Sequence, residues 1–213
     1  MKERPILFSG PMVRAILSGA KTQTRRVVKP APDADQVLSM RTGSTGFRFA
    51  FDIADFCRTT DGRRLRWEIP YGQPGDRLWV REAFMPCPLE NPTTGPSRWN
   101  IAYASDAEQV ERQAPAGYNP MLYNYERWTP SIHMPRWASR ITLEITSVRV
   151  ERLQAISEAD ARAEGAIGAV DNSIGNNWCA RQAFSALWES INGPGSWDAD
   201  PWVWAVEFRR IER

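Results

Sequence analysis

One short segment near the start of the chain concentrates side chains that can do chemistry. Residues 19–26 read Gly-Ala-Lys-Thr-Gln-Thr-Arg-Arg and follow a short apolar stretch. Lys21 and Thr24 supply an amine and a hydroxyl, which are the groups of a base and a nucleophile in acyl transfer. An ordinary lysine is protonated at neutral pH, so Lys21 can act as a base only where burial or a neighbouring cation lowers its pKa. Arg25 and Arg26 follow directly and are candidates for that neighbour.

The same residues also have an ordinary structural interpretation. Threonine is a good strand former, and a lysine after a helix interacts favourably with the helix dipole. Residues three apart on a regular strand point to opposite faces. Lys21 and Thr24 can therefore converge only if Lys21 still belongs to the exit from the preceding helix, which Gly19 permits.

Composition argues against several other chemistries. His133 is the one histidine, and the three cysteines are far apart in the sequence, so no metal site, disulfide framework or histidine cluster is indicated. We expect no cofactor and no metal. No run of about 18 apolar residues is present, and the apolar segment near the N-terminus is too short for a secretory signal. We therefore expect a cytoplasmic protein that does not bind membranes.

Charge is informative through its distribution. The net charge of +2 gives little support for broad binding to duplex nucleic acid. Residues 1–30, however, hold seven basic side chains against one acidic side chain. Such a cluster suits a phosphate-bearing ligand, although a solvated face is the commoner meaning of clustered charge.

Ten tryptophans stand out in the composition. Most are expected to pack in the core, while an exposed subset could stack on nucleobases. Trp79 is expected in the core because its neighbours Leu78 and Val80 are both apolar, which is typical of a strand covered on both faces.

Hydrophobic periodicity and turn residues predict an α+β chain. Helices are predicted at about 11–17, 157–165 and 184–191, the second opened by a Ser-x-x-Asp capping box and the third stopped by Gly-Pro-Gly. Strands are predicted at about 22–28, 47–53, 63–69, 77–82, 141–150 and 202–209, with a β-bulge near 146–147. The Pro-rich residues 86–130 show little periodicity and are interpreted as a long excursion outside the core.

With these elements in order, the sequence resembles the ASCH family, a branch of the PUA-like β-barrels, and in particular its members common in phages and prophages. The stretches that carry the resemblance are 16–26, 75–82, 141–164 and 204–211. The resemblance implies a single domain over residues 1–213: a small β-barrel of about six strands with three helices and insertions at about 30–70 and 86–130.

The resemblance also implies a cleft that accepts a nucleobase, a nucleoside or nucleic acid. One bacterial member is an amidohydrolase that deacetylates N4-acetylcytidine with a lysine, a threonine and a glutamate. Its Lys-x-x-Thr element resembles Lys21 to Thr24, and its glutamate, near the end of a short helix after a bent strand, resembles Glu164. These three residues are the candidate catalytic set, and no metal is implied.

Five further residues are candidates for substrate contact. Arg26 could hold a phosphate or a carboxylate, and Glu82 follows a predicted strand and could face the cleft. His133, Arg136 and Trp137 follow the Pro-rich segment and could contact a base and its phosphate. Each also has a structural alternative: a paired arginine, a solvated carboxylate, a satisfied histidine or a packed indole.

Three functions remain open from the sequence. The first is hydrolysis of an N4-acylated cytidine or a related modified base. The second is a module that binds RNA, DNA or a modified base without turnover, and the third is a metal-independent ribonuclease. The basic N-terminal segment favours the second and third, because a free nucleoside carries no phosphate for it to hold. The Lys-Thr-Glu set favours the first. The expected partner is a modified pyrimidine nucleoside or a nucleic acid.

Overall fold

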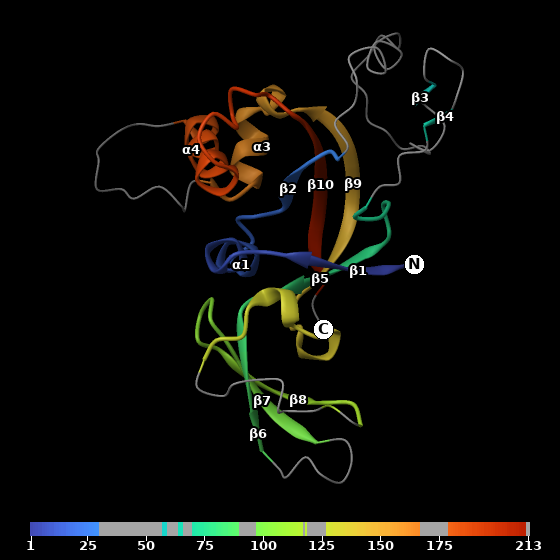
Figure 1. Cartoon of the computed structure of the whole chain (residues 1–213), viewed down its shortest axis with the longest axis vertical. Coiled ribbons are helices and arrows are strands. Elements are labelled where there is room, and N and C mark those ends of the chain that lie inside the picture. The colour runs from blue at the N-terminus through green and yellow to red at the C-terminus, as the bar shows by residue number, and fades with distance from the viewer. Residues whose placement is uncertain are drawn as a thin grey trace. The chain divides into compact units, whose positions relative to one another are not determined.

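The computed structural model shown in Figure 1 describes residues 1–29, 57–58, 64–65, 70–89, 97–116, 118, 127–166 and 179–211. Two compact units are present, each assembled from segments far apart in the sequence. Unit 1 comprises Met1–Gly19, Arg77–Leu143 and Arg210–Arg213, and unit 2 comprises Ala20–Asp76 and Glu144–Arg209. A single ASCH domain over residues 1–213 stays a prediction.

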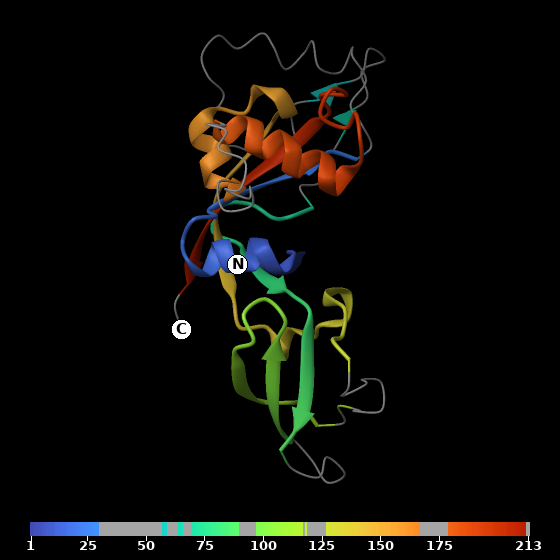
Figure 2. The ribbon, with the colours of Figure 1, turned by 90° about the vertical axis from the view of Figure 1, so that its left-hand side faces the viewer.

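Unit 2 contains neighbouring strands of one sheet and two helices that lie against them. Strand β2 (Gln23–Val27) pairs antiparallel with β10 (Trp202–Ile211), and β10 lies next to β9 (Thr142–Arg152), whose first two residues belong to unit 1. Helices α3 (Glu158–Ala163) and α4 (Ala180–Asn192) lie together on one side of these strands in Figure 1 and in front of them in Figure 2. The helices therefore cover one face of the sheet.

The helices of unit 2 follow from local sequence signals. Helix α3 begins with the predicted capping box, in which Ser157 Oγ accepts from the Asp160 amide and the Asp160 carboxylate accepts from the Ser157 amide. Helix α4 turns Phe184 and Trp188 inward and ends at Gly193, whose φ of 96° favours glycine. The core between helices and sheet contains Leu153, Ile156, Ala161, Ala166, Ala180, Ala183, Phe184, Trp188 and Val203.

The alternation of buried and less buried side chains along β9 shifts by one residue, as the sequence predicted. Leu143 and Ile145 are buried, and the next buried side chain is Val148, one position out of step. The predicted β-bulge would produce this change, because an extra residue moves the following side chains to the other face. The bulge itself stays a prediction.

Unit 1 combines a parallel strand pair, a helix and an antiparallel sheet. Strand β1 (Glu3–Leu7), which the sequence analysis did not predict, pairs in parallel with β5 (Arg77–Arg81), and helix α1 (Gly10–Leu17) follows β1. Strands β6 (Phe84–Pro88), β7 (Arg98–Tyr103) and β8 (Gln109–Gln113) form an antiparallel sheet in that order. Two short 3-10 helices follow, η4 (Ser131–His133) and η5 (Arg136–Ala138).

The interpretation of residues 86–130 as an excursion outside the core was wrong. Strands β7 and β8 lie within this range, and unit 1 has its own core of Phe84, Trp99, Ile101, Tyr103, Ala114, Met134 and Ala138. Prolines obscured the signal. Pro86 and Pro88 belong to β6, an edge strand of its sheet, where a proline need not remove a ladder hydrogen bond.

The class of the fold is confirmed as mixed α+β, with three α-helices in the described part of the chain. The strand pairings of the described residues do not close a barrel, so the PUA-like barrel stays a prediction. The strand predicted at 47–53 lies outside the described residues. Strand β4 (Arg64–Leu65) lies within the strand predicted at 63–69, and it pairs antiparallel with β3 (Cys57–Arg58), which was not predicted.

The capping box supplies a first test of the fold. Ser157→Ala removes the acceptor for the Asp160 amide at the start of α3, so we expect the free energy of unfolding to fall by about 1 kcal/mol. The matched control is Ser185→Ala within α4, whose hydroxyl only bonds back to the Gln182 carbonyl and whose replacement favours the helix. Urea unfolding followed by circular dichroism measures both. Equal stabilities of the two variants would contradict the capping role.

Candidate functional site

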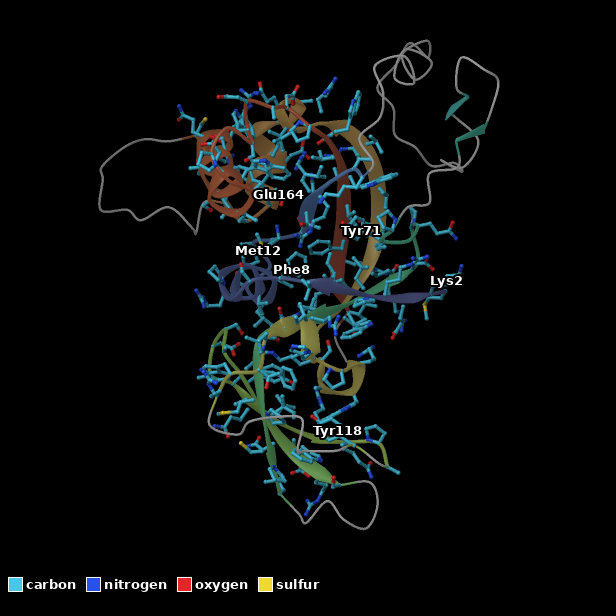
Figure 3. All side chains as sticks on the ribbon, viewed as in Figure 1. Lys2, Phe8, Met12, Tyr71, Tyr118 and Glu164 are labelled. Carbon is cyan, nitrogen blue, oxygen red and sulfur yellow. The ribbon has the colours of Figure 1, made fainter. Side chains whose placement is uncertain are left out.

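Lys21 and Glu164 meet in the interior of unit 2. The Lys21 ammonium donates to Glu164 Oε2 at 2.8 Å and to the Glu164 backbone carbonyl at 2.9 Å. Their side chains are 1% and 4% exposed. The two residues form an isolated antiparallel bridge, and the Thr22 amide donates to the Ala163 carbonyl beside it. The start of β2 is thereby fastened to the end of α3, where Figure 3 labels Glu164.

Local backbone geometry explains why these residues can meet. Glu164 is the C-cap of α3, and Gly165 follows with a φ of 75°, so the chain leaves the helix at this carboxylate. Helix α1 ends at Leu17, and Gly19 with a φ of 78° turns the chain toward β2. Lys21 therefore lies between the helix and the regular strand, the position that the sequence required for it to be a site residue.

The pKa of Lys21 is lowered from its ordinary value of 10.5. Burial is the largest cause, because it disfavours the charged ammonium. The Glu164 carboxylate opposes burial by attraction and hydrogen bonding, while the positive charges of Arg26 and Arg25 lower the pKa further. The conditions that the sequence set for a basic lysine, burial and neighbouring cations, are both present.

Thr24 is buried, with 2% of its surface exposed, and lies opposite Val206 in the β2–β10 pair. Alternation along β2 directs it to the face opposite Arg25, which reaches Glu164. Arg26, in turn, lies on the face opposite Arg25 and lowers the pKa of Lys21 more strongly than Arg25 does. Lys21, just before the strand, is therefore affected by the charge of Arg25 on one face and by the charge of Arg26 on the other.

An ion network surrounds the Lys21–Glu164 pair. Arg25 Nη1 donates to Glu164 Oε1 at 3.0 Å, and Arg25 Nε donates to Glu151 Oε1 at 3.0 Å. Arg149 pairs with Glu151 at 2.9 Å, with Asp160 at 2.7 Å and with Glu207. In the sequence Arg25 was only a neighbouring charge, and Glu151 and Glu207 were not candidates, because local spacing does not reveal which distant charges will pair.

Arg26 is half-buried, and its charge acts on both Lys21 and Tyr71. The pKa of Tyr71 is raised by burial, and Arg26 opposes the rise. Tyr71, labelled in Figure 3, was not among the candidate residues of the sequence. A phenol and a guanidinium are groups that can hold the polar edge of a ligand.

Glu82, a predicted substrate contact, is engaged inside unit 1. Its carboxylate accepts from Arg140 Nε and Nη2, both at 3.0 Å, and from Ser105 Oγ at 2.6 Å. The Glu82 and Arg140 side chains are 2% and 5% exposed. The Arg140 guanidinium also lies 4.1 Å from the centre of the Tyr103 ring. This geometry is that of a structural ion pair and not of the solvated carboxylate that the sequence offered as the alternative.

The other predicted contacts also lie in unit 1. His133 is exposed, and Arg136 pairs with Glu3 at 2.8 Å. Trp137 is half-buried and packs edge-on against Tyr118, labelled in Figure 3, with ring centres 4.8 Å apart. The structure thus brings Lys21, Arg25 and Glu164 into contact within unit 2, whereas Thr24 and Arg26 lie on the face of β2 opposite Arg25. A substrate contact by His133, Arg136 or Trp137 stays a prediction.

The prediction that Trp79 is a core residue was wrong. Leu78 and Val80 are buried, but Trp79 is half-buried on the other side of β5. The guanidinium groups of Arg81 and Arg136 lie 5.2 and 6.0 Å from its ring centre. The apolar sequence of β5 suggested a strand buried on both faces, but only one face is buried. On the other, half-open face, cation–π contacts cover Trp79 in place of apolar side chains.

The described residues contain neither a group placed to hold a metal ion nor a helix fit to cross a membrane. No group of three His, Cys, Asp or Glu side chains is placed to hold a metal ion. No described helix combines the length and the apolar character that crossing a membrane requires. Comparisons with protein-family models, curated proteins and solved structures gave no significant match.

The lowered pKa of Lys21 predicts how stability depends on pH. Between that pKa and 10.5 the unfolded chain binds a proton at Lys21 that the folded chain does not, so stability should rise with pH in this window. Lys21→Met removes the titrating group. We expect the stability of the native chain relative to this variant to increase as pH rises to about 10, as measured by urea unfolding. A flat or falling difference would contradict the lowered pKa.

The Glu82–Arg140 pair predicts a large effect of truncation in unit 1. Glu82→Ala leaves a buried guanidinium without its main partner and should cost about 3–5 kcal/mol in the free energy of unfolding. The control is Glu111→Ala, which breaks the exposed pair with Arg98 and should change stability by only about 0.5 kcal/mol. Chemical denaturation followed by tryptophan fluorescence compares them, and similar losses would refute a structural role for the buried pair.

Proposed function

We propose that unit 2 carries a metal-independent amidohydrolase site for an N4-acylated cytidine or a related modified base, with Lys21, Thr24 and Glu164 as its catalytic residues. The observation that carries this proposal is the buried contact between the Lys21 ammonium and the Glu164 carboxylate, at 2.8 Å. The resemblance of the sequence to the ASCH family supports the choice of reaction.

The choice of a lysine at this position supports a chemical role. The sequence holds 27 lysines and arginines, of which only Lys2, Lys21 and Lys29 are lysines. The buried cation is thus drawn from the rarer type in this chain. An arginine would keep its charge at any physiological pH, whereas a lysine can lose its proton when burial lowers its pKa. A titratable cation is what a proton-transfer site needs.

The proposed reaction is an acyl transfer to oxygen. Lys21, as the neutral amine, takes a proton from the Thr24 hydroxyl or from a water that Thr24 positions. The oxygen attacks the acyl carbon, the bond from that carbon to N4 breaks, and N4 receives the proton from Lys21. Where Thr24 itself is acylated, water then hydrolyses the ester. Glu164 orients the Lys21 nitrogen, and the Arg26 guanidinium is available to stabilise developing negative charge.

A second candidate function is recognition of a modified base or nucleic acid without turnover. One observation favours it: both oxygens of Glu164 are engaged, one by Lys21 and one by Arg25. Such a pair resists rearrangement and is suited to shaping a pocket. In that case the lysine would serve as a fixed structural cation.

Turnover of N4-acetylcytidine tests the proposal. Cytidine and acetate are separated by chromatography after incubation with the purified chain. If the proposal holds, Lys21→Met, Glu164→Gln and Thr24→Val should each lower kcat by about a hundredfold or more, the usual contribution of an acid–base or nucleophilic group. The control is Lys29→Met, which removes an exposed lysine close to the site in sequence and should leave kcat unchanged.

Other outcomes separate the alternatives. If the native chain releases no cytidine but binds labelled oligonucleotides with an affinity that falls as salt rises, the recognition function is favoured, since that slope reports phosphate contacts. Cleavage of the oligonucleotides would favour the ribonuclease. Equal activity of Lys21→Met and the native chain would exclude Lys21 from the reaction.

A further inference from the structure

We propose that Arg25 is the positioning residue of this site: by holding one carboxylate oxygen of Glu164, it fixes the other oxygen against Lys21. The inference deepens the proposed function and rests on it for its catalytic consequence. Arg25 would not touch substrate in this role. It would act through Glu164.

The contacts of the carboxylate divide cleanly between the two cations. Arg25 Nη1 reaches Glu164 Oε1 at 3.0 Å, and Lys21 Nζ reaches Glu164 Oε2 at 2.8 Å. A carboxylate held by one oxygen alone can rotate about its terminal torsion, which is broad and soft. Held by both, it presents Oε2 to the lysine in one orientation.

Arg25 is itself immobilised by several groups. Its side chain is fully buried, and its Nε and Nη2 both donate to Glu151. Asp160 Oδ2 lies 3.7 Å from Nη2, and the Phe184 ring centre lies 5.9 Å from the guanidinium carbon. With its oxygen turned toward the arginines, the Gln23 amide accepts from Arg25 at 2.7 Å. A planar fork can span Glu151 and Glu164 at once, which a single ammonium cannot.

The arrangement also controls the charge state of Lys21. The Glu164 carboxylate raises the pKa of Lys21, and the positive charge of Arg25 lowers it. Removing Arg25 would take away one of the two positive charges that oppose the carboxylate, the other being that of Arg26, and the lysine would then retain its proton to higher pH. Arg25 thus permits a close Lys–Glu contact without locking the lysine in its charged form.

A purely structural role makes a different prediction, and Arg149 is the residue that separates the two. Arg149 belongs to the same network and pairs with Glu151 and Asp160, as Arg25 does, but its third partner is Glu207 and not Glu164. Replacing either arginine loosens the network. Only replacement of Arg25 releases the Glu164 carboxylate.

The test is an NMR titration of the lysine side chains. With three lysines in the sequence, and with Lys2 and Lys29 exposed, the Lys21 Cε and Nζ signals are assigned by their loss in Lys21→Met. We expect Arg25→Gln to raise the pKa of Lys21, because it removes one of the two positive charges that lower it. Arg149→Gln should leave it near the native value.

Arg25→Lys and Arg149→Lys form a second pair of variants for the same titration. This pair also tests the proposal if the glutamine variants fail to fold. Arg25→Lys keeps the charge but loses the fork, so the pKa of Lys21 should rise above the native value, by less than in Arg25→Gln. Arg149→Lys should not move it. A native Lys21 pKa in the folded Arg25 variants, or an equal shift in the Arg149 variants, would overturn the assignment.

Turnover adds a readout that depends on the proposed function. If the native chain deacetylates N4-acetylcytidine, the acidic limb of its kcat profile should move to higher pH in Arg25→Gln, with KM unchanged, and stay in place in Arg149→Gln. A limb that does not move would overturn the positioning role. If the native chain shows no turnover, the amidohydrolase proposal fails, and the lysine titration still decides the role of Arg25.

Discussion

Burying a charge is costly unless an opposite charge and hydrogen bonds compensate for the lost water, and this constraint organises unit 2. The Lys21 ammonium and the Glu164 carboxylate are almost completely buried, so each needs the other at close range. Their contact in turn places the exit of α3 beside the start of β2. Breaking it would leave an uncompensated charge in the interior.

The charged residues around this pair need opposite charges for the same reason. Glu164 also accepts from Arg25, whose own burial requires Glu151. Glu151 and Asp160 then pair with Arg149, which reaches Glu207 on β10. The network therefore joins β2, β9, β10 and α3 through side chains.

Among the described residues each unit contains a buried ion cluster, and the cluster of unit 2 buries a lysine as well as an arginine. In unit 1 the cation is Arg140, which meets Glu82 through two parallel bonds and keeps its charge at any accessible pH. In unit 2 the central cation is Lys21, whose pKa burial lowers. A permanently charged pair stabilises a fold, whereas a titratable pair can also transfer protons. This difference in side-chain chemistry is why the candidate site is placed in unit 2, although Glu82 was also a candidate.

The sequence by itself determined the elements whose signals are local. The Ser157 capping box, the inward Phe184 and Trp188, and the Gly193 stop predicted α3 and α4, because helix ends and helix faces depend on residues a few positions apart. Strand β6 and the half-open face of β5 were not predicted. Residues that are distant in sequence decide whether a strand can contain prolines and whether an indole is covered. For the site, the sequence singled out Lys21 and Glu164 through a resemblance, and it left their contact undecided. Only the tertiary structure decided that they meet and that Arg25 holds their carboxylate, because Arg25 and Glu164 lie 139 residues apart and no local spacing records which charges the fold will bury together.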